Sequence, residues 1–317
     1  MAKTIRKVSL ILFVILMTAP ARADEPQSPK VVVSIKPIHS LVAGVMQGVA
    51  EPQLLMKGGG SPHGYVLRPS EARSLANADL VVWVGHELES FLEKPLSTLG
   101  RNARQLELSE ELESNLLPLR EGGSWEAHDD DHGDREPEPA AHHEEHGEQD
   151  QHLWLDPQLA KQIVTKTAAA LAEIDPARRE LYQKNAARLR ERLDGLHAQL
   201  KAKLAPVKNV PYVVFHDGYQ YFEAAYGLNA VGSVTIDPER RPGAKRIREI
   251  REKIKELHAR CVFSEPQFES RLVATVIEGT GAKTGVLDPV GVELPAGAES
   301  YFQLLNALAD NLVAGLR

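Results

Sequence analysis

The chain has 317 residues, of which 43% are hydrophobic and 26% are charged. This apolar content excludes an intrinsically disordered protein, and the length favours two domains. A single cysteine excludes a disulfide scaffold, a four-cysteine zinc module and a cysteine-bound iron–sulfur cluster. The net charge of −7 argues against a general nucleic-acid-binding protein, which needs a basic face.

The first 23 residues have the pattern of a secretory signal peptide. Lys3, Arg6 and Lys7 precede an apolar run, and Ala21 and Ala23 stand at the two small positions that a signal peptidase reads. The run is too short to span a membrane as a helix. We therefore expect cleavage after residue 23 and, because no cysteine sits at the cleavage site itself, a periplasmic protein that is not membrane-anchored.

The rest of the chain alternates strand and helix patterns. Short apolar or β-branched runs are typical of buried parallel strands, and the segments between them have helical spacing or helix-start signals. In the first half we expect strands at 31–35, 53–56, 80–84 and 105–108, with helices at 39–47, from 69 onward and at 87–99. In the second half we expect strands at 212–215, 230–235, 261–264 and 284–287, with helices at 219–226, 242–258 and 267–279. The alternation predicts an α/β protein with two βα lobes, each built on a parallel sheet.

A long helix is expected between the two halves. It starts at Asp175-Pro176, and Pro206 stops it. Its leucines keep helical spacing: Leu189, Leu193, Leu196, Leu200 and Leu204. A helix over 176–204 is a rigid connector of roughly 40 Å. We therefore divide the chain into a signal peptide (1–23), an N-terminal lobe (24–156), a helical region (157–206) and a C-terminal lobe (207–317).

Residues 121–150 form a low-complexity segment in the first lobe. They hold 12 of the 44 acidic residues and one basic residue, Arg135, so we expect a disordered acidic loop. Imidazoles bind borderline divalent cations, and carboxylates raise the local cation concentration. We therefore expect a secondary, low-affinity metal site in this His-rich loop; a solvated spacer is the competing interpretation. Its histidines are His128, His132, His142, His143 and His146.

Four further residues lie in loops at the expected cleft. His63 follows the second expected strand, His216 and Asp288 directly follow strands of the second half, and His152 precedes the helix that starts at residue 157. Ligands of open α/β sheets bind at the carboxyl ends of strands. Three imidazoles and a carboxylate converging between the lobes would make a tetrahedral site, the geometry that zinc prefers. His39 also follows a strand and is the main rival to this set.

Six segments carry a family resemblance. They are SPHGYVLRPS at 61–70, ADLVVWVG at 78–85, HLWLDP at 152–157, FHDGYQYF at 215–222, FSEPQF at 263–268 and LDP at 287–289. In this order, and with the His-rich insertion before residue 152, the chain resembles the ZnuA-type periplasmic zinc-binding proteins of bacterial ABC uptake systems. The resemblance implies two βα lobes joined by a rigid helix. It also implies that Zn²⁺ is held between the lobes and delivered to a membrane permease, which a cytoplasmic ATPase powers.

The resemblance also implies the ligands. His63, His152 and His216 match the imidazole ligands of the family, and a histidine at 216 favours zinc because manganese- and iron-binding relatives usually carry a glutamate there. Some zinc-binding members have a glutamate just before the first histidine, where this chain has Pro62. The fourth ligand is therefore Asp288 or a water, and we favour Asp288.

The expected function is that of a high-affinity zinc carrier, not an enzyme, working as a monomer. An exported zinc-dependent hydrolase is a competing hypothesis, because three histidines with one open position is also a catalytic layout. No obvious general base lies at helical spacing to a ligand, which disfavours a hydrolase. Two further hypotheses are a binding protein for a different divalent metal such as manganese, and an adhesin with structural zinc.

Overall fold

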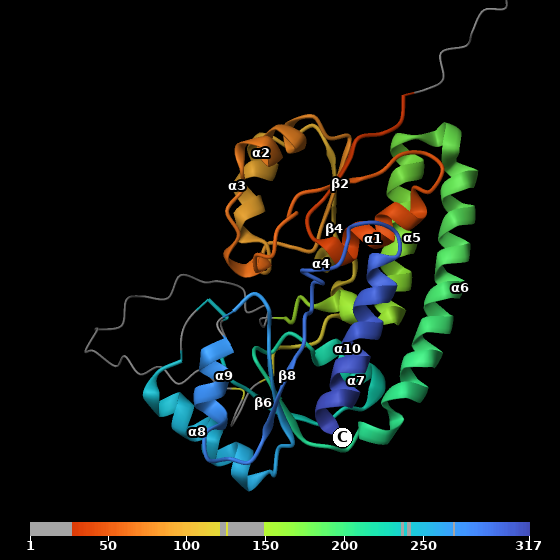
Figure 1. The fold of residues 1–317 in the computed structure, drawn as a ribbon. Helices are drawn as coiled ribbons and strands as arrows, with labels where there is room; N and C mark the ends of the chain where they lie inside the picture. Colours follow the sequence, from red (N-terminus) through yellow and green to blue (C-terminus); the bar gives the residue numbers. More distant parts are fainter. Residues whose placement is uncertain (1–26, 121–124, 126–148, 236–237, 240–241, 269) are drawn as a thin grey trace, which may run out of the picture.

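The computed structural model describes residues 27–120, 125, 149–235, 238–239, 242–268 and 270–317. The expected signal peptide and the five histidines of the acidic loop lie outside these ranges. The described chain forms two four-stranded parallel sheets with helices packed on them (Figure 1). This arrangement confirms the predicted α/β class with two βα lobes.

The first sheet has the strand order β2-β1-β3-β4. Its strands are β1 (Val31–Val33), β2 (Gln53–Leu54), β3 (Leu80–Trp83) and β4 (Arg104–Glu107). Its helices are α1 (Lys36–Val45), α2 (Pro69–Ala76), α3 (Ser90–Thr98) and α4 (Leu108–Glu111). The central strands β1 and β3 are buried along their whole length, because α2 and α3 cover one face of the sheet and α1 packs on the other. That burial explains why both strands are continuous apolar runs in the sequence.

The second sheet repeats this topology with the order β6-β5-β7-β8. Its strands are β5 (Tyr212–Val214), β6 (Ala230–Ser233), β7 (Cys261–Ser264) and β8 (Lys283–Val286). Its first three helices are α7 (Gln220–Tyr226), α8 (Ala244–Glu256) and α9 (Ser270–Ile277). Helices α8 and α9 bury their apolar sides against β5 and β7 on the outer face. The observed strands overlap the expected ones and end one or two residues earlier at several carboxyl ends.

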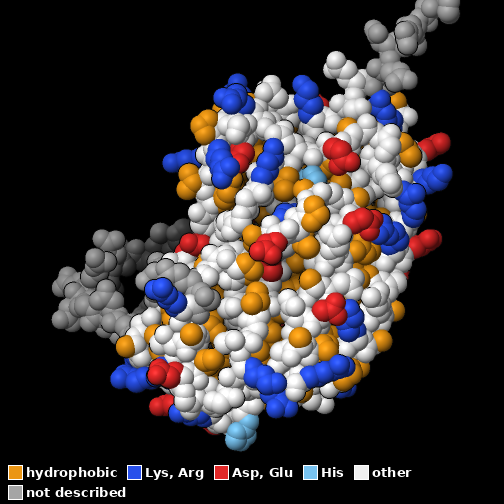
Figure 2. Space-filling model, in the orientation of Figure 1, with side chains coloured by type: hydrophobic (Ala, Val, Ile, Leu, Met, Phe, Trp, Pro, Cys, Tyr) orange, Lys and Arg blue, Asp and Glu red, His pale blue; other side chains and the backbone are white. Residues whose placement is uncertain are grey.

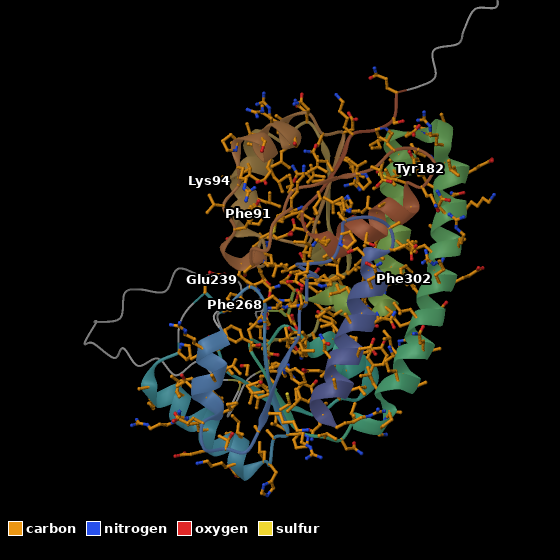
Figure 3. All side chains as sticks on the ribbon, viewed as in Figure 1. Phe91, Lys94, Tyr182, Glu239, Phe268 and Phe302 are labelled. Atoms are coloured by element: carbon orange, nitrogen blue, oxygen red, sulfur yellow. The ribbon has the colours of Figure 1, made fainter. Side chains whose placement is uncertain are left out.

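Three long helices line one side of both lobes (Figure 1). They are α5 (Pro157–Ile174), α6 (Arg179–Leu204) and α10 (Ser300–Leu316). Asp156 caps α5 by accepting a hydrogen bond from the Gln158 amide at 2.8 Å. The 26 residues of α6 span about 39 Å, and its leucine row is buried. A single 3₁₀ turn, Pro176–Arg178, precedes α6, and the Tyr182 hydroxyl donates to Asp175 there (Figure 3).

Helix α10 is an element that the sequence analysis did not predict. It follows the last strand and packs against α1 of the first lobe and against α6, so it ties the lobes together a second time. On its outer side the Arg192 guanidinium lies 4.1 Å from the centre of the Phe302 ring (Figure 3). Acidic and basic side chains are interspersed along this side of the molecule (Figure 2), and several pair between α6 and its neighbours.

Buried hydrogen bonds also join the lobes beside the sheets. The Lys36 ammonium group donates to the carbonyl oxygens of Gly291, Val292 and Leu294, at 2.5, 2.8 and 2.8 Å. The Trp154 indole donates to the Pro289 carbonyl at 2.8 Å. The loop after β8 is therefore held against the first lobe. In the part of the chain that the structure describes, no helix has both the length and the apolar character that membrane spanning requires.

Candidate metal centre

Three histidines reach the cleft from three separate chain segments. His63 lies in a 3₁₀ turn, Pro62–Gly64, in which Ser61 accepts a hydrogen bond from the His63 amide at 3.2 Å. His152 directly precedes the turn Leu153–Leu155, whose three apolar side chains are fully buried. His216 follows the end of β5 by two residues. Local capping and burial therefore fix the backbone at each position.

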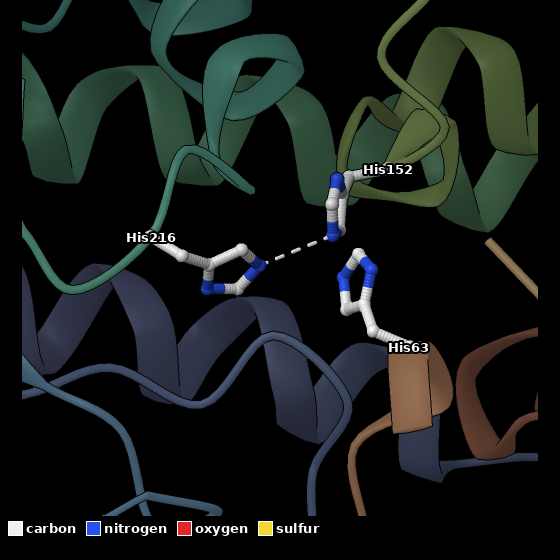
Figure 4. Close-up of side chains that lie close together, drawn as sticks. All are labelled: His63, His152 and His216. Atoms are coloured by element: carbon white, nitrogen blue, oxygen red, sulfur yellow. Dashed lines mark hydrogen bonds between the residues drawn. The ribbon is translucent and has the colours of Figure 1, made fainter. Parts of the chain in front are cut away.

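The three imidazoles point toward one another (Figure 4). One ring nitrogen from each of His63, His152 and His216 lies within 4.8 Å of the others. The ring centres are 5.4 Å apart for His63 and His152, 5.5 Å for His63 and His216, and 5.1 Å for His152 and His216. His152 is 6% exposed and His216 is 4% exposed, so these two side chains are largely out of water, and His63 is half-buried.

Carboxylates determine which nitrogens of two of these rings are free. His152 Nδ1 lies 2.8 Å from Asp150 Oδ1, and His216 Nδ1 lies 2.6 Å from Glu265 Oε1. A carboxylate accepts the Nδ1–H, so in the neutral ring the lone pair is on Nε2. The same pairing of a carboxylate with a ligating histidine fixes tautomer and ring orientation in metal sites.

The free nitrogens of His152 and His216 face each other. Their Nε2 atoms are 3.3 Å apart (dashed line in Figure 4). Without a metal ion this contact is a hydrogen bond, in which a proton on one of the two Nε2 atoms lies between the rings. A bound metal ion takes the place of that proton. Two nitrogens bound to one tetrahedral zinc, each at about 2.0–2.1 Å, are separated by about 3.3–3.4 Å. The observed spacing therefore fits a shared zinc ion.

His63 completes the cluster as a neutral imidazole. Its Nε2 atom is buried and has no hydrogen-bond partner among the described residues. Burial, together with the neighbouring His152 and His216, holds the pKa of His63 well below its ordinary value. Burial alone would lower the pKa of His216, but the Glu265 carboxylate outweighs it and raises that pKa. Neutral imidazole is the form that binds a metal ion.

Gly218 keeps the space in front of these nitrogens open. A Cβ atom at this position would lie 2.4 Å from His216 Nε2 and 3.0 Å from His152 Nε2. Non-bonded carbon and nitrogen atoms do not approach so closely. A side chain of any kind at 218 would therefore occupy the place where an ion would bind.

Two spaces adjoin the histidines, and all three rings line both. The larger is a cavity of about 430 Å³ whose wall also includes Glu87, Arg120, Trp125 and Asp217. Arg120 pairs there with Asp217 and with the buried Glu223, and the Trp125 ring covers its guanidinium group at 3.6 Å. The smaller is a hole of about 10 Å³ on the side of Glu265 and Gln267.

The structure brings together His63, His152 and His216, but it does not bring Asp288 to them. Asp288 Oδ1 accepts hydrogen bonds from Gln267 Nε2 and from the amides of Val290 and Gly291, and Oδ2 accepts one from the Val292 amide. The carboxylate therefore turns into its own loop.

The rival His39 lies elsewhere. It is buried and bonded to the Pro52 carbonyl at 2.8 Å, outside the cluster.

The sequence analysis missed three residues that shape the site: Asp150, Glu265 and Gly218. Glu265 directly follows β7, so the same strand-end reasoning that selected His216 also applies to it. Asp150 lies two residues before His152, a separation at which a carboxylate can reach both the backbone amide and the ring. No sequence signal marks Gly218, because its importance comes from the approach of two rings.

Comparison with known proteins shows the family of the chain. The profile of the family described as "zinc-uptake complex component A periplasmic", ZnuA, matches residues 31–315. The chain belongs to the ZnuA family. A ZnuA-family relative, the high-affinity zinc uptake system protein ZnuA of Brucella abortus, is 48% identical over 302 residues, which cover 89% of this chain and 90% of the relative. The Yersinia pestis protein of the same name is 36% identical over 296 residues, covering 92% of each chain.

The fold of this ZnuA-family chain also matches a solved structure. The periplasmic zinc-binding protein TroA from Treponema pallidum aligns with a TM-score of 0.76 and 23% identity, covering 91% of this chain and 99% of that one. At this identity the likeness concerns the fold alone. It confirms the two-lobed architecture with its long connecting helix.

Proposed function

We propose that this ZnuA-family protein captures Zn²⁺ between its lobes and delivers it to an ABC permease for import. The observation that carries the proposal is the pair of Nε2 atoms of His152 and His216, 3.3 Å apart, each on a ring whose Nδ1 is bonded to a carboxylate. The Brucella and Yersinia relatives are named as high-affinity zinc uptake proteins, which supports the same function.

The chemistry of the site favours zinc over hard cations. His63, His152 and His216 offer imidazole nitrogens, which suit zinc, whereas magnesium, calcium and manganese prefer oxygen ligands. The two carboxylates bonded to the rings, on Asp150 and Glu265, increase the basicity of the nitrogens and supply negative charge close to the ion. We propose these three histidines as the protein ligands, and we do not include Asp288 among them.

Capture and release require that the ion reaches the site from solvent. The cavity of about 430 Å³ provides such a route, since Glu87 and Asp217 lie in its wall beside the three histidines. A carrier of this kind acts in the periplasm after export, as a monomer and without catalysis. It then presents its loaded cleft to the permease, which its ATPase powers. These steps are part of the proposal.

The five histidines of the acidic loop are proposed as a separate, weaker zinc collector. A deletion that tests this must stop before Asp150, because that side chain holds His152. Pro118 and Gln149 pair across the base of the loop, so a short glycine–serine linker can replace residues 121–148. The deleted protein is expected to keep its tight zinc site and to bind less zinc in total. Loss of tight binding would contradict a separate role.

Transport is tested in cells. The chain is returned to a strain that lacks its gene and grows poorly when zinc is chelated. The parent and the control His86→Ala, whose ring lies on the surface beside Glu107, are expected to restore growth and uptake of radioactive zinc. His216→Ala is expected to fail. Full uptake by His216→Ala would contradict the proposed function.

A further inference from the structure

The small hole beside the histidines has the size of one water molecule. Its volume is about 10 Å³, close to the smallest volume that holds a water. Its wall contains the three histidines together with Glu265, Gln267 and Phe268 (Phe268 is labelled in Figure 3). A water placed there would lie next to the ion and away from the larger cavity.

Gln267 presents a hydrogen-bond acceptor that nothing in the described protein uses. Its Nε2 atom donates to Asp288 Oδ1 at 2.9 Å. An ionised carboxylate only accepts, so this bond fixes which end of the amide is nitrogen and which is oxygen. The oxygen, Oε1, is buried and has no partner among the described residues. A buried acceptor left without a hydrogen-bond partner is unfavourable, so a partner such as a water is expected at this atom.

We propose that Gln267 is a positioning residue that holds a water as the fourth ligand of the zinc ion. This inference rests on the proposed function and deepens it. The water binds zinc through its oxygen and donates one hydrogen to Gln267 Oε1. Asp288 affects the water indirectly, because its carboxylate fixes the orientation of the Gln267 amide. Three imidazoles and this water complete a tetrahedral set.

The position of this water has a chemical consequence. A zinc hydrolase needs an open coordination position that a substrate can reach. The hole of about 10 Å³ has room for one water but not for a substrate in its place. The fourth coordination position of the zinc ion is then filled by a water that a substrate cannot replace. This arrangement suits a carrier and disfavours a hydrolase.

The test uses Co²⁺ in place of zinc, because its visible absorption spectrum reports the ligand set. Gln267→Met keeps the length of the side chain and removes the oxygen acceptor. The matched control is Gln199→Met, on the exposed side of helix α6 and remote from the histidines, where the amide nitrogen also donates to a side-chain oxygen, that of Asn306. Chelator competition gives the zinc affinity of each protein, and azide is added to each Co²⁺-loaded protein as a small anionic ligand.

The inference predicts that Gln267→Met changes the Co²⁺ spectrum and lowers zinc affinity about 10–100-fold. Removal of a residue that holds a metal ligand by a hydrogen bond typically has an effect of this size. Gln199→Met is expected to match the parent in both, and azide is expected to leave the parent spectrum unchanged. An unchanged spectrum in Gln267→Met, or a parent spectrum that shifts with azide, overturns the inference. The azide result on the parent stands even if the variant folds poorly. If the parent itself binds zinc no better than His63→Ala, the proposed function fails as well.

Discussion

Gly218 and His216 stand in a relationship that leaves room for an ion but not for a methyl group. A Cβ atom at 218 would lie 2.4 Å from His216 Nε2, the nitrogen that also faces His152 at 3.3 Å. At Gly218 the backbone, which carries no side chain there, therefore lies directly against the metal-binding nitrogens of His216 and His152. The space is defined as much by the missing side chain as by the imidazoles.

Gly218→Ala is therefore expected to remove tight zinc binding while the fold is retained. The methyl group would occupy the position of the ion, so affinity should fall by more than about 100-fold, beyond what loss of a supporting group costs. Chelator competition measures the effect. Gly195→Ala is the control, because a Cβ there meets open space on helix α6; it should keep full zinc affinity and gain about 0.5–1 kcal/mol of stability. Equal zinc affinity in both variants would show that the ion binds elsewhere.

The carboxylates behind the histidines are expected to strengthen zinc binding by their charge. Glu265→Gln and Asp150→Asn each leave an amide oxygen that accepts the Nδ1–H, so His216 and His152 keep their orientation. Zinc affinity should nonetheless fall about 10–100-fold in each variant, because the negative charge is lost. Isothermal titration against a zinc chelate measures this. Glu110→Gln, on the exposed side of α4, should have no effect. Unchanged affinity in both site variants would contradict the account.

Lys36 is expected to contribute strongly to the stability of the junction between the lobes. Lys36→Met would leave the carbonyl oxygens of Gly291, Val292 and Leu294 without their shared donor. The free energy of unfolding should fall by about 2–4 kcal/mol, because buried acceptors lose their partner. Urea denaturation would show a lower midpoint, and Lys57→Met, at an exposed position, should match the parent. A midpoint equal to that of the parent would mean that the junction does not depend on this ammonium group.

Glu89 is expected to make stability decrease with rising pH. Burial raises its pKa from 4.5 to about 7, even though the Val84 and Gly85 amides donate to the carboxylate. Below about pH 4.5 the group is protonated in both the folded and the unfolded state and has no effect. Between pH 4.5 and 7 the unfolded chain releases the proton and the folded chain keeps it, so the free energy of unfolding falls, by about 3 kcal/mol in total.

Glu89→Gln separates this effect from other titrations. The amide oxygen still accepts from the Val84 amide but does not ionise. Relative to the parent, the variant should therefore gain stability as pH rises from 4.5 to 8. Urea denaturation with a chelator present, at several pH values, measures the difference. A stability difference that stays constant across this range would contradict the raised pKa.

Much of the fold could be predicted because burial leaves a direct mark on sequence. Strands β3 and β7 are covered on both faces, and both appear as unbroken apolar or small-residue runs. The connecting helix was predicted from its leucine row, which is the row that packs inward. Helix α10 was missed although its leucines at 304, 305, 308 and 312 are buried at helical spacing, so a usable signal was present.

The candidate site shows where such prediction stops. The strand-end rule placed His216 and Asp288 at the same edge, but a rule about position does not say where a side chain points. Asp288 is followed by three amides that bind its carboxylate, whereas His216 meets Glu265 behind it and His152 in front. The difference lies in contacts between segments that are distant in sequence. The role of Gly218 comes from such contacts alone.

The central claim is that one zinc ion is bound by the three histidines of the cleft. The most direct measurement is a chelator-competition titration of the parent, of His63→Ala, His152→Ala and His216→Ala, and of the surface control His86→Ala. We predict one tight zinc site per chain in the parent and the control, and loss of that site in each of the three cleft variants. Tight binding that survives in all three cleft variants would contradict the account.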